Sequence, residues 1–168
     1  MILTGINPTQ IDPGTALGVG NLFPPGIEID DPRTVTLVGN RIKYVQVNAS
    51  VASTNAVKLD ISVTAANRRF TVISTGAVTD IFEGFANNHT GTAAQFSWIW
   101  ITVAGFCSGV KNLNAGVAGS VLAPSGTAGT LTLSPSAAVA DAIIVAGGRR
   151  AFSLVTPSGN VGDVQIGG

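Results

Sequence analysis

The residues that most often carry enzyme chemistry are scarce in this chain, which has one histidine and one cysteine in 168 residues. A hydroxyl or thiol nucleophile needs a general base beside it, and His89 is the only imidazole. His89 lies in an Asn/Thr/Gly stretch typical of a solvated loop, whereas Cys107 lies in an apolar run typical of a buried small side chain. One cysteine and one histidine are too few for a structural zinc site. We therefore predict no nucleophilic catalysis and no zinc.

Carboxylates are the remaining candidates for chemistry. The one acidic cluster, residues 28–31, lacks the spaced ligands of an EF-hand loop, so we interpret it as a polar stretch of an extended segment. A carboxylate pair for sugar hydrolysis would have to come from Asp60, Asp80 and Glu83, which no motif marks. The glycine-rich turns lack the Gly-Lys-Ser/Thr ending of a phosphate loop. The sequence thus predicts a protein that is not an enzyme and that needs no metal or cofactor.

Composition points to protein partners. Charged residues make up 11% of the chain, against roughly a quarter in ordinary soluble proteins, and the formal net charge is zero. Nucleic-acid binding needs a concentrated excess of basic residues, whereas the basic doublets here are only Arg68-Arg69 and Arg149-Arg150. We interpret these doublets as contacts with a subunit or partner. No secretory signal and no apolar run of membrane-spanning length is visible, so we expect no membrane association.

Residues 96–105 form the stretch around which the rest is organised. They include both tryptophans, are rich in β-branched and aromatic residues, and end in glycine, so they predict a strand. Alternation places Phe96, Trp98 and Trp100 on one face and residues 99, 101 and 103, all aliphatic, on the other. Because neither face is polar, we expect the strand to be central in a layered structure or covered by another subunit.

Residues 1–33 read as an extended arm, because five prolines and five glycines exclude long helices and central strands. Apolar residues that would be wasted on a solvated tail recur in it, above all Leu22, Phe23, Ile27 and Ile29. We expect this arm to dock on its own domain or on a neighbour. Our specific prediction is that it reaches beyond its own domain, to a neighbouring subunit or another protein surface.

Residues 34–168 predict a β domain of short strands separated by turns. The expected strands are residues 34–38 and 41–47 (a hairpin), 57–63, 69–74, 77–85, 96–105, 106–111, 120–122, 130–133, 151–155 and 161–166. Residues 134–146 fit either a short helix or a strand. With no alternating helices, the pattern indicates an all-β fold, a small β-barrel or β-sandwich preceded by the Pro/Gly-rich N-terminal arm.

The centre of the chain resembles tailed-bacteriophage capsid cement (decoration) proteins. The resemblance rests on the aromatic strand at residues 96–105, Val110-Lys111, Ala115-Gly116, residues 120–123 (Ser-Val-Leu-Ala), residues 125–131 (Ser-Gly-Thr-Ala-Gly-Thr-Leu) and an upstream Tyr-Val strand at residues 44–50. It implies a small β domain, often trimeric, that binds the outer surface of the phage head and bridges major capsid protein subunits without catalysis. It also implies synthesis in the host cytoplasm and residence on the virion.

An alternative function is a carbohydrate-binding or host-attachment module in which Trp98, Trp100 and Tyr44 form an aromatic platform. We favour the cement protein, because sugar platforms have polar groups beside the rings and the flanking residues here are Ile and Val. The residues expected at a subunit or partner interface are Leu22, Phe23, Ile27, Ile29, Arg68, Arg69, Trp98, Trp100, Arg149 and Arg150.

Overall fold

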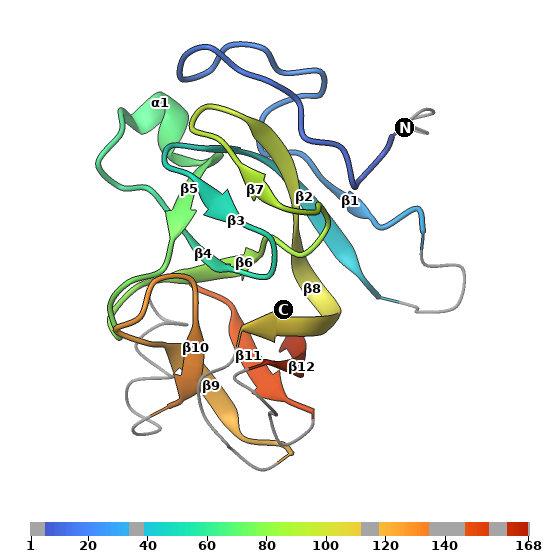
Figure 1. Ribbon diagram of the computed structural model, residues 1–168, viewed down its shortest axis with the longest axis vertical. Coiled ribbons are helices and arrows are strands. Elements are labelled where there is room, and N and C mark those ends of the chain that lie inside the picture. Colours follow the sequence, from blue (N-terminus) through green and yellow to red (C-terminus); the bar gives the residue numbers. More distant parts are fainter. Residues whose placement is uncertain (1–5, 34–38, 112–117, 135–146, 155–160, 168) are drawn as a thin grey trace.

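The structure is a computed structural model that describes residues 6–33, 39–111, 118–134, 147–154 and 161–167 (Figure 1). Within these residues the only helix is α1 (Ala65–Arg68), and none is long and apolar enough to cross a membrane. The strands are β1 (Glu28–Asp30), β2 (Arg41–Val47), β3 (Val51–Ala52), β4 (Ala56–Leu59), β5 (Thr71–Ser74), β6 (Phe82–Phe85), β7 (Thr92–Ala93), β8 (Trp98–Lys111), β9 (Val121–Pro124), β10 (Leu131–Leu133), β11 (Arg150–Ser153) and β12 (Val161–Gly167). The predicted all-β fold is confirmed.

Five strands close into a small barrel. The ring of pairings runs β2–β5–β4–β6–β8 and returns to β2; only the β2–β5 pair is parallel. Because strand side chains alternate between faces, alternate residues point into the ring and fill it. The separate β3–β7 pair adds Val51 and Ala93 to the same core. The core residues are Val45, Val47, Val51, Val57, Val72, Ala86, Ala93, Ile99, Ile101 and Val103.

Strand β8 connects the barrel to a second sheet. Its first half pairs with β2 and its second half with β12, and Figure 1 shows it running from the barrel down to β9–β12. We predicted that the strand ends at Gly105, but it continues to Lys111. Gly105 has φ 94°, and a Cβ there would lie 1.9 Å from Asn40 Oδ1. The Asn40 side chain uses this space to bond both the N–H (2.7 Å) and the carbonyl (3.1 Å) of Phe106, so the glycine allows a bend rather than an end.

The second sheet has its own hydrophobic core. Its order is β8–β12–β11–β9–β10, with antiparallel neighbours throughout. Barrel residues Ala56, Phe82 and Phe85 pack into this core, so the two parts of the molecule share an apolar boundary. The other members are Cys107, Val110, Leu122, Leu131, Ala151, Val164 and Ile166.

Of the two apolar faces predicted for residues 96–105, the part over residues 98–103 is confirmed, whereas Phe96 has φ 68° and lies before β8. Ile99, Ile101 and Val103 lie in the barrel core, whereas Trp98 and Trp100 belong to a separate cluster on the outer surface of the barrel. This aromatic cluster consists of Ile42, Tyr44, Phe70, Trp98 and Trp100, and it is packed against Ile6, Phe23, Ile27 and Ile29 of the N-terminal segment. The cover therefore comes from the same chain.

The N-terminal segment, residues 6–33, lies on its own domain. Asp12 exchanges two backbone hydrogen bonds with Trp98, and β1 pairs antiparallel with β2, Glu28 lying opposite Lys43. The approach is close enough that a Cβ on Gly14 would lie 2.0 Å from the Phe96 carbonyl oxygen. Phe23, Ile27 and Ile29, which we predicted to reach a neighbour, therefore pack on their own domain, whereas Leu22 stays exposed. The sheet begins at β1 rather than after residue 33.

Smaller differences from the predicted strands have local causes. The strand predicted over residues 57–63 ends at Leu59, because the Asp60 side chain accepts hydrogen bonds from the N–H (2.9 Å) and Oγ (2.6 Å) of Ser62 and turns the chain. The strand predicted from Arg69 begins at Thr71, after α1. Residues 34–38 and 135–146, where a hairpin strand and an undecided element were predicted, lie outside the described residues.

Candidate attachment surface

Buried polar side chains of the barrel hold a loop of the N-terminal segment in place. The side chain of Gln46, fully buried in β2, donates to the Ala16 carbonyl (2.8 Å) and accepts from the Gly18 N–H (2.7 Å). The indole of Trp98 donates to the Val19 carbonyl (2.8 Å). We call residues 16–22 the pinned loop, because these bonds fix its backbone from below.

The far end of the pinned loop rests on Tyr44. The Leu22 N–H donates to the Tyr44 hydroxyl (3.3 Å), and that hydroxyl donates to Asp12 Oδ2 (2.7 Å). Burial and, after it, the bond to Asp12 raise the pKa of Tyr44, so the phenol stays protonated. The hydroxyl therefore remains a donor to Asp12 at any physiological pH.

The pinned loop presents two large apolar side chains to solvent. Leu22 is 65% exposed and Val19 is 50% exposed, although the backbone beneath them is fixed by side chains that water does not reach. Next to them, Phe23 turns inward and packs edge-on against Tyr44, with ring centroids 5.3 Å apart, and against Trp100 at 5.5 Å. An ordered loop with outward aliphatic side chains is the arrangement that a protein-binding surface needs.

Both tryptophans are absent from this surface. Trp98 is 0% exposed and Trp100 is 1% exposed, and Trp98 is stacked between Tyr44 (5.2 Å) and Phe70 (5.4 Å). They cannot form a platform for sugar rings in this fold, and their expected place at a subunit or partner interface is corrected. Three other expected interface residues, Phe23, Ile27 and Ile29, are likewise partly buried against the aromatic cluster. Of the four predicted anchors in the segment, only Leu22 faces outward.

The basic doublet at the start of β11 is also engaged within the chain. Arg149 donates to Glu28 Oε1 (2.8 Å) and lies 3.9 Å from Glu83, while Arg41 reaches Glu28 at 3.3 Å. Glu83 is further paired with Lys43 at 2.6 Å, in a buried ion pair. These charges tie β1, β2, β6 and the start of β11 together. Arg150 is half-buried as the first residue of β11.

The other basic doublet remains at the surface. Arg68 ends α1 and Arg69 follows it, both exposed. Within the described ranges neither arginine has a carboxylate within 4 Å, and Arg68 makes one long hydrogen bond, to the Val63 carbonyl (3.3 Å). These two residues are therefore available for a partner.

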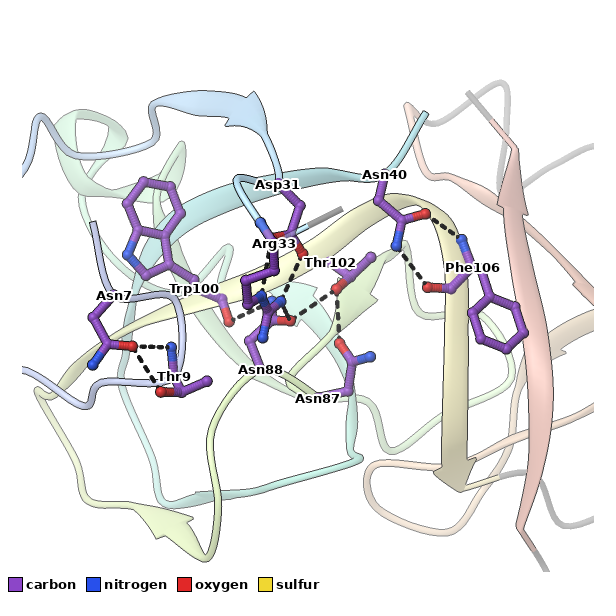
Figure 2. Close-up of polar contacts among 10 residues, drawn as sticks. All are labelled: Asn7, Thr9, Asp31, Arg33, Asn40, Asn87, Asn88, Trp100, Thr102 and Phe106. Carbon is purple, nitrogen blue, oxygen red and sulfur yellow. Dashed lines mark hydrogen bonds and ion pairs between the residues drawn. The ribbon is translucent and has the colours of Figure 1, made fainter. Parts of the chain in front are cut away.

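A polar cleft of about 350 Å³ lies beside the bend of β8 (Figure 2). In it the Arg33 guanidinium bonds both oxygens of Asp31 (2.9 and 2.6 Å) and Asn88 Oδ1 (2.6 Å). Burial raises the pKa of Asp31, but the hydrogen bonds and charge of Arg33 outweigh it and lower the pKa overall. Asn88 donates to the Trp100 carbonyl (3.1 Å), and Thr102 donates to Asn87 (2.8 Å). These groups satisfy one another, so the cleft joins β1, β8 and the loop after β6.

The two residues considered for catalysis are both buried. We predicted a solvated His89, but it is 4% exposed, and its ring nitrogens make no well-formed hydrogen bond to any described residue. Burial lowers the pKa of His89, more than the nearby Val51 backbone raises it. Burial also raises the pKa of the Cys107 thiol to about 12, as the prediction of a buried small side chain implies. Among the described residues no group of three or more His, Cys, Asp or Glu side chains is placed to hold a metal.

Comparisons with known proteins add no relative. No family model matches the chain, and no curated protein and no solved structure matches it. A functional proposal therefore rests on the surfaces of this molecule. The pinned loop is the feature that sequence reasoning identified only in part: Leu22 was predicted, whereas the roles of Gln46 and Val19 were not. Gln46 does carry a signal, since an amide inside an apolar strand needs a partner when it is buried.

Proposed function

We propose that this chain is a structural protein of a phage virion, a capsid cement protein that binds the outer surface of the head. It would be made in the host cytoplasm and would stabilise contacts between major capsid protein subunits without catalysis. The observation that carries the proposal is the pinned loop, in which four hydrogen bonds with buried side chains hold a backbone that turns Val19 and Leu22 outward. The sequence resemblance described above supplies the identity of the partner.

The energetics favour attachment through this loop. Covering a leucine-sized side chain contributes on the order of 1.5–3 kcal/mol, whereas ordering a free chain costs about 1–2 kcal/mol per residue. In the pinned loop that ordering is already complete before a partner arrives, because Gln46, Trp98 and Tyr44 hold it. Two apolar contacts per copy give a weak attachment on their own, and linking copies in a trimer would add avidity.

Self-association is the second part of the proposal, with a trimer as the expected assembly. The support is a chain with zero net charge and 11% charged residues, which leaves little repulsion between copies. Exposed aliphatic residues at the far end of the molecule, Leu133, Leu154 and Val161, offer an apolar contact there. Light scattering tests this part, since a stable monomer of 16.9 kDa at micromolar concentration would contradict it.

Co-sedimentation with expanded, undecorated heads of the phage that encodes the chain tests the proposed function. The wild-type chain should pellet with the heads. Leu22→Asp should bind at least about tenfold more weakly, because a charge replaces the apolar side chain that the head would cover. Val78→Asp is the matched control, since Val78 is 44% exposed in the turn before β6, outside the pinned loop. A wild-type chain that fails to pellet would contradict the cement function. Equal binding by a folded Leu22→Asp variant would contradict the role of the loop.

A further inference from the structure

A groove of about 600 Å³ opens on the outer face of the barrel beside α1. Ile73 in β5 and Ile81 before β6 line it and are only partly covered, and Leu59 in β4, which also packs on the barrel core, lines it too. A fourth, Ile61, is 69% exposed at its rim. Leaving several partly exposed aliphatic side chains of one groove in contact with water is unfavourable. Such a groove is typical of a surface that a partner covers.

The rim of the groove is held in a fixed conformation. The turn that carries Ile61 is closed by the buried Asp60 carboxylate, which accepts from both the N–H and the hydroxyl of Ser62 and also from the Asn48 amide (2.7 Å). Across the groove, Asp80 pairs with Lys58 at 2.6 Å and accepts backbone bonds from the turn that precedes it. As in the pinned loop, buried or paired polar groups order a backbone that exposes an aliphatic side chain.

The charged residues around the groove differ in whether another side chain of the chain pairs with them. Asp80 is neutralised by Lys58, and Asp60 is 3% exposed with its oxygens hydrogen-bonded. Arg68 is exposed, and within the described part of the chain no carboxylate lies within 4 Å of it. The groove therefore presents an apolar hollow next to a free positive charge. The complementary ligand carries an aliphatic group and a carboxylate.

We propose that this groove is a second protein-binding site, which accepts an aliphatic side chain flanked by an aspartate or glutamate of a partner protein. A protein segment fits better than a free small molecule, because Ile61 stands at the rim, where only a ligand attached to a larger surface covers it. The site goes beyond the proposed attachment through the pinned loop and is separate from it. Gly18 of the loop lies beside Asn67 of α1, so the two sites flank the same helix.

Peptide titration followed by amide NMR on the full-length chain tests the site. The probe is a blocked hexapeptide with Leu-Asp at its centre, compared with Leu-Asn and Ala-Asp versions. The Leu-Asp peptide should cause saturable shifts at residues 58–62, 73 and 79–81. The Leu-Asn peptide should bind about threefold more weakly, as expected for an exposed ion pair, and the Ala-Asp peptide about tenfold more weakly, as expected for a lost apolar contact.

Two variants assign the contacts. Arg68→Gln should remove the preference for Leu-Asp over Leu-Asn, and Ile61→Ser should weaken both peptides. Leu133→Ser is the matched control, because Leu133 is exposed in β10, outside the groove. Circular dichroism confirms that each variant is folded, which exposed positions favour. Absence of saturable shifts up to about 10 mM peptide, equal binding of the Ala-Asp peptide, or shifts confined to residues 16–22 would each overturn the groove site. None of these results bears on whether the chain binds phage heads.

Discussion

The two faces of the first half of β8 are equally apolar but are closed in different ways. Ile99, Ile101 and Val103 are covered by the barrel itself, through a ring of strand pairings and close-packed aliphatic side chains. Trp98 and Trp100 are covered by a segment with little regular structure, which is attached by aromatic packing and by hydrogen bonds from buried polar groups. The barrel face is thus covered by paired strands, whereas the aromatic face is covered through contacts of specific side chains.

This difference explains where the molecule presents its apolar residues. A strand that covers a face must alternate, whereas a proline- and glycine-rich segment is free of that period. Leu22 and Phe23, adjacent in sequence, can therefore take different roles, one exposed and one packed on Tyr44. The outer side of the covering segment is therefore able to present Val19 and Leu22 to solvent.

Removing residues 1–30 should have the largest effect on stability, because it exposes the aromatic face of β8 and leaves the barrel face covered. Tyr44, Trp98 and Trp100 would become exposed, and β1 would be lost. We expect the free energy of unfolding to fall by at least about 5 kcal/mol, given roughly 1.5–3 kcal/mol per large apolar side chain, with aggregation in most conditions. Tryptophan emission and urea denaturation measure this. A truncated monomer with unchanged emission and stability would show that the segment is not needed to close the face.

Lys43 and Glu83 form a buried ion pair on the barrel side of β2 and β6. Lys43→Met should lower the free energy of unfolding by about 3–5 kcal/mol, because it leaves a buried carboxylate whose nearest remaining cation, Arg149, is 3.9 Å away. Adding Glu83→Leu should restore most of the loss, since a matched apolar pair replaces the ions. Urea denaturation of the two variants measures both effects. A loss below about 1 kcal/mol for Lys43→Met would place the pair among weak surface ion pairs.

The aromatic face can be loosened at one point with Gln46→Leu. The Ala16 carbonyl and the Gly18 N–H would lose their partner, which should cost about 1–3 kcal/mol. The sharper readout is hydrogen exchange, which should accelerate at Gly18 while the barrel strands stay protected. Gln165→Leu is the control, because among the described residues the Gln165 side chain makes only one long hydrogen bond, to the Ile166 carbonyl (3.4 Å). Unchanged exchange at Gly18 would mean that packing alone orders the loop.

The smallest expected effect concerns pH and the buried His89. Its pKa is lowered in the folded chain, so the unfolded chain takes up a proton first as the pH falls below about 6.5. Stability should therefore decline between about pH 7 and pH 5, and His89→Gln should flatten that decline. The carboxyl groups with lowered pKa act at lower pH, because their stabilisation is lost only as they become protonated; they are Asp31, Asp60 and Asp80. Urea denaturation at several pH values checks this, and parallel curves for both proteins would contradict it.

Periodicity predicted the fold well where a strand is buried on both faces. The alternation of residues 98–103 held because one residue in two must face each core. Gly105 misled the prediction, since a glycine ends a strand in most contexts, and here a distant Asn40 side chain occupies the space of its missing Cβ. The burial of His89 was missed for a similar reason, because Val51, nearly forty positions earlier, lies against it. Long-range contacts of this kind leave no local pattern.

The sequence identified residues whose apolar or charged side chains could form an interface, but not which of them face solvent in the fold. Leu22 and Arg68 were expected at an interface from residue type, and both are exposed. Phe23 and Trp100 were expected there for the same reason, and they pack on each other. Residue type indicates that a side chain needs cover, whereas only the fold determines whether the chain supplies that cover itself.

The central claim is that the N-terminal segment closes the aromatic face from within and offers its outer side to a partner. A cryo-electron microscopy map of decorated heads tests it most directly. We expect Val19 and Leu22 to contact the major capsid protein while Trp98 and Trp100 stay covered by the N-terminal segment of the same chain. A map in which the segment leaves its own domain, or in which the pinned loop faces solvent while another surface meets the capsid, would contradict it.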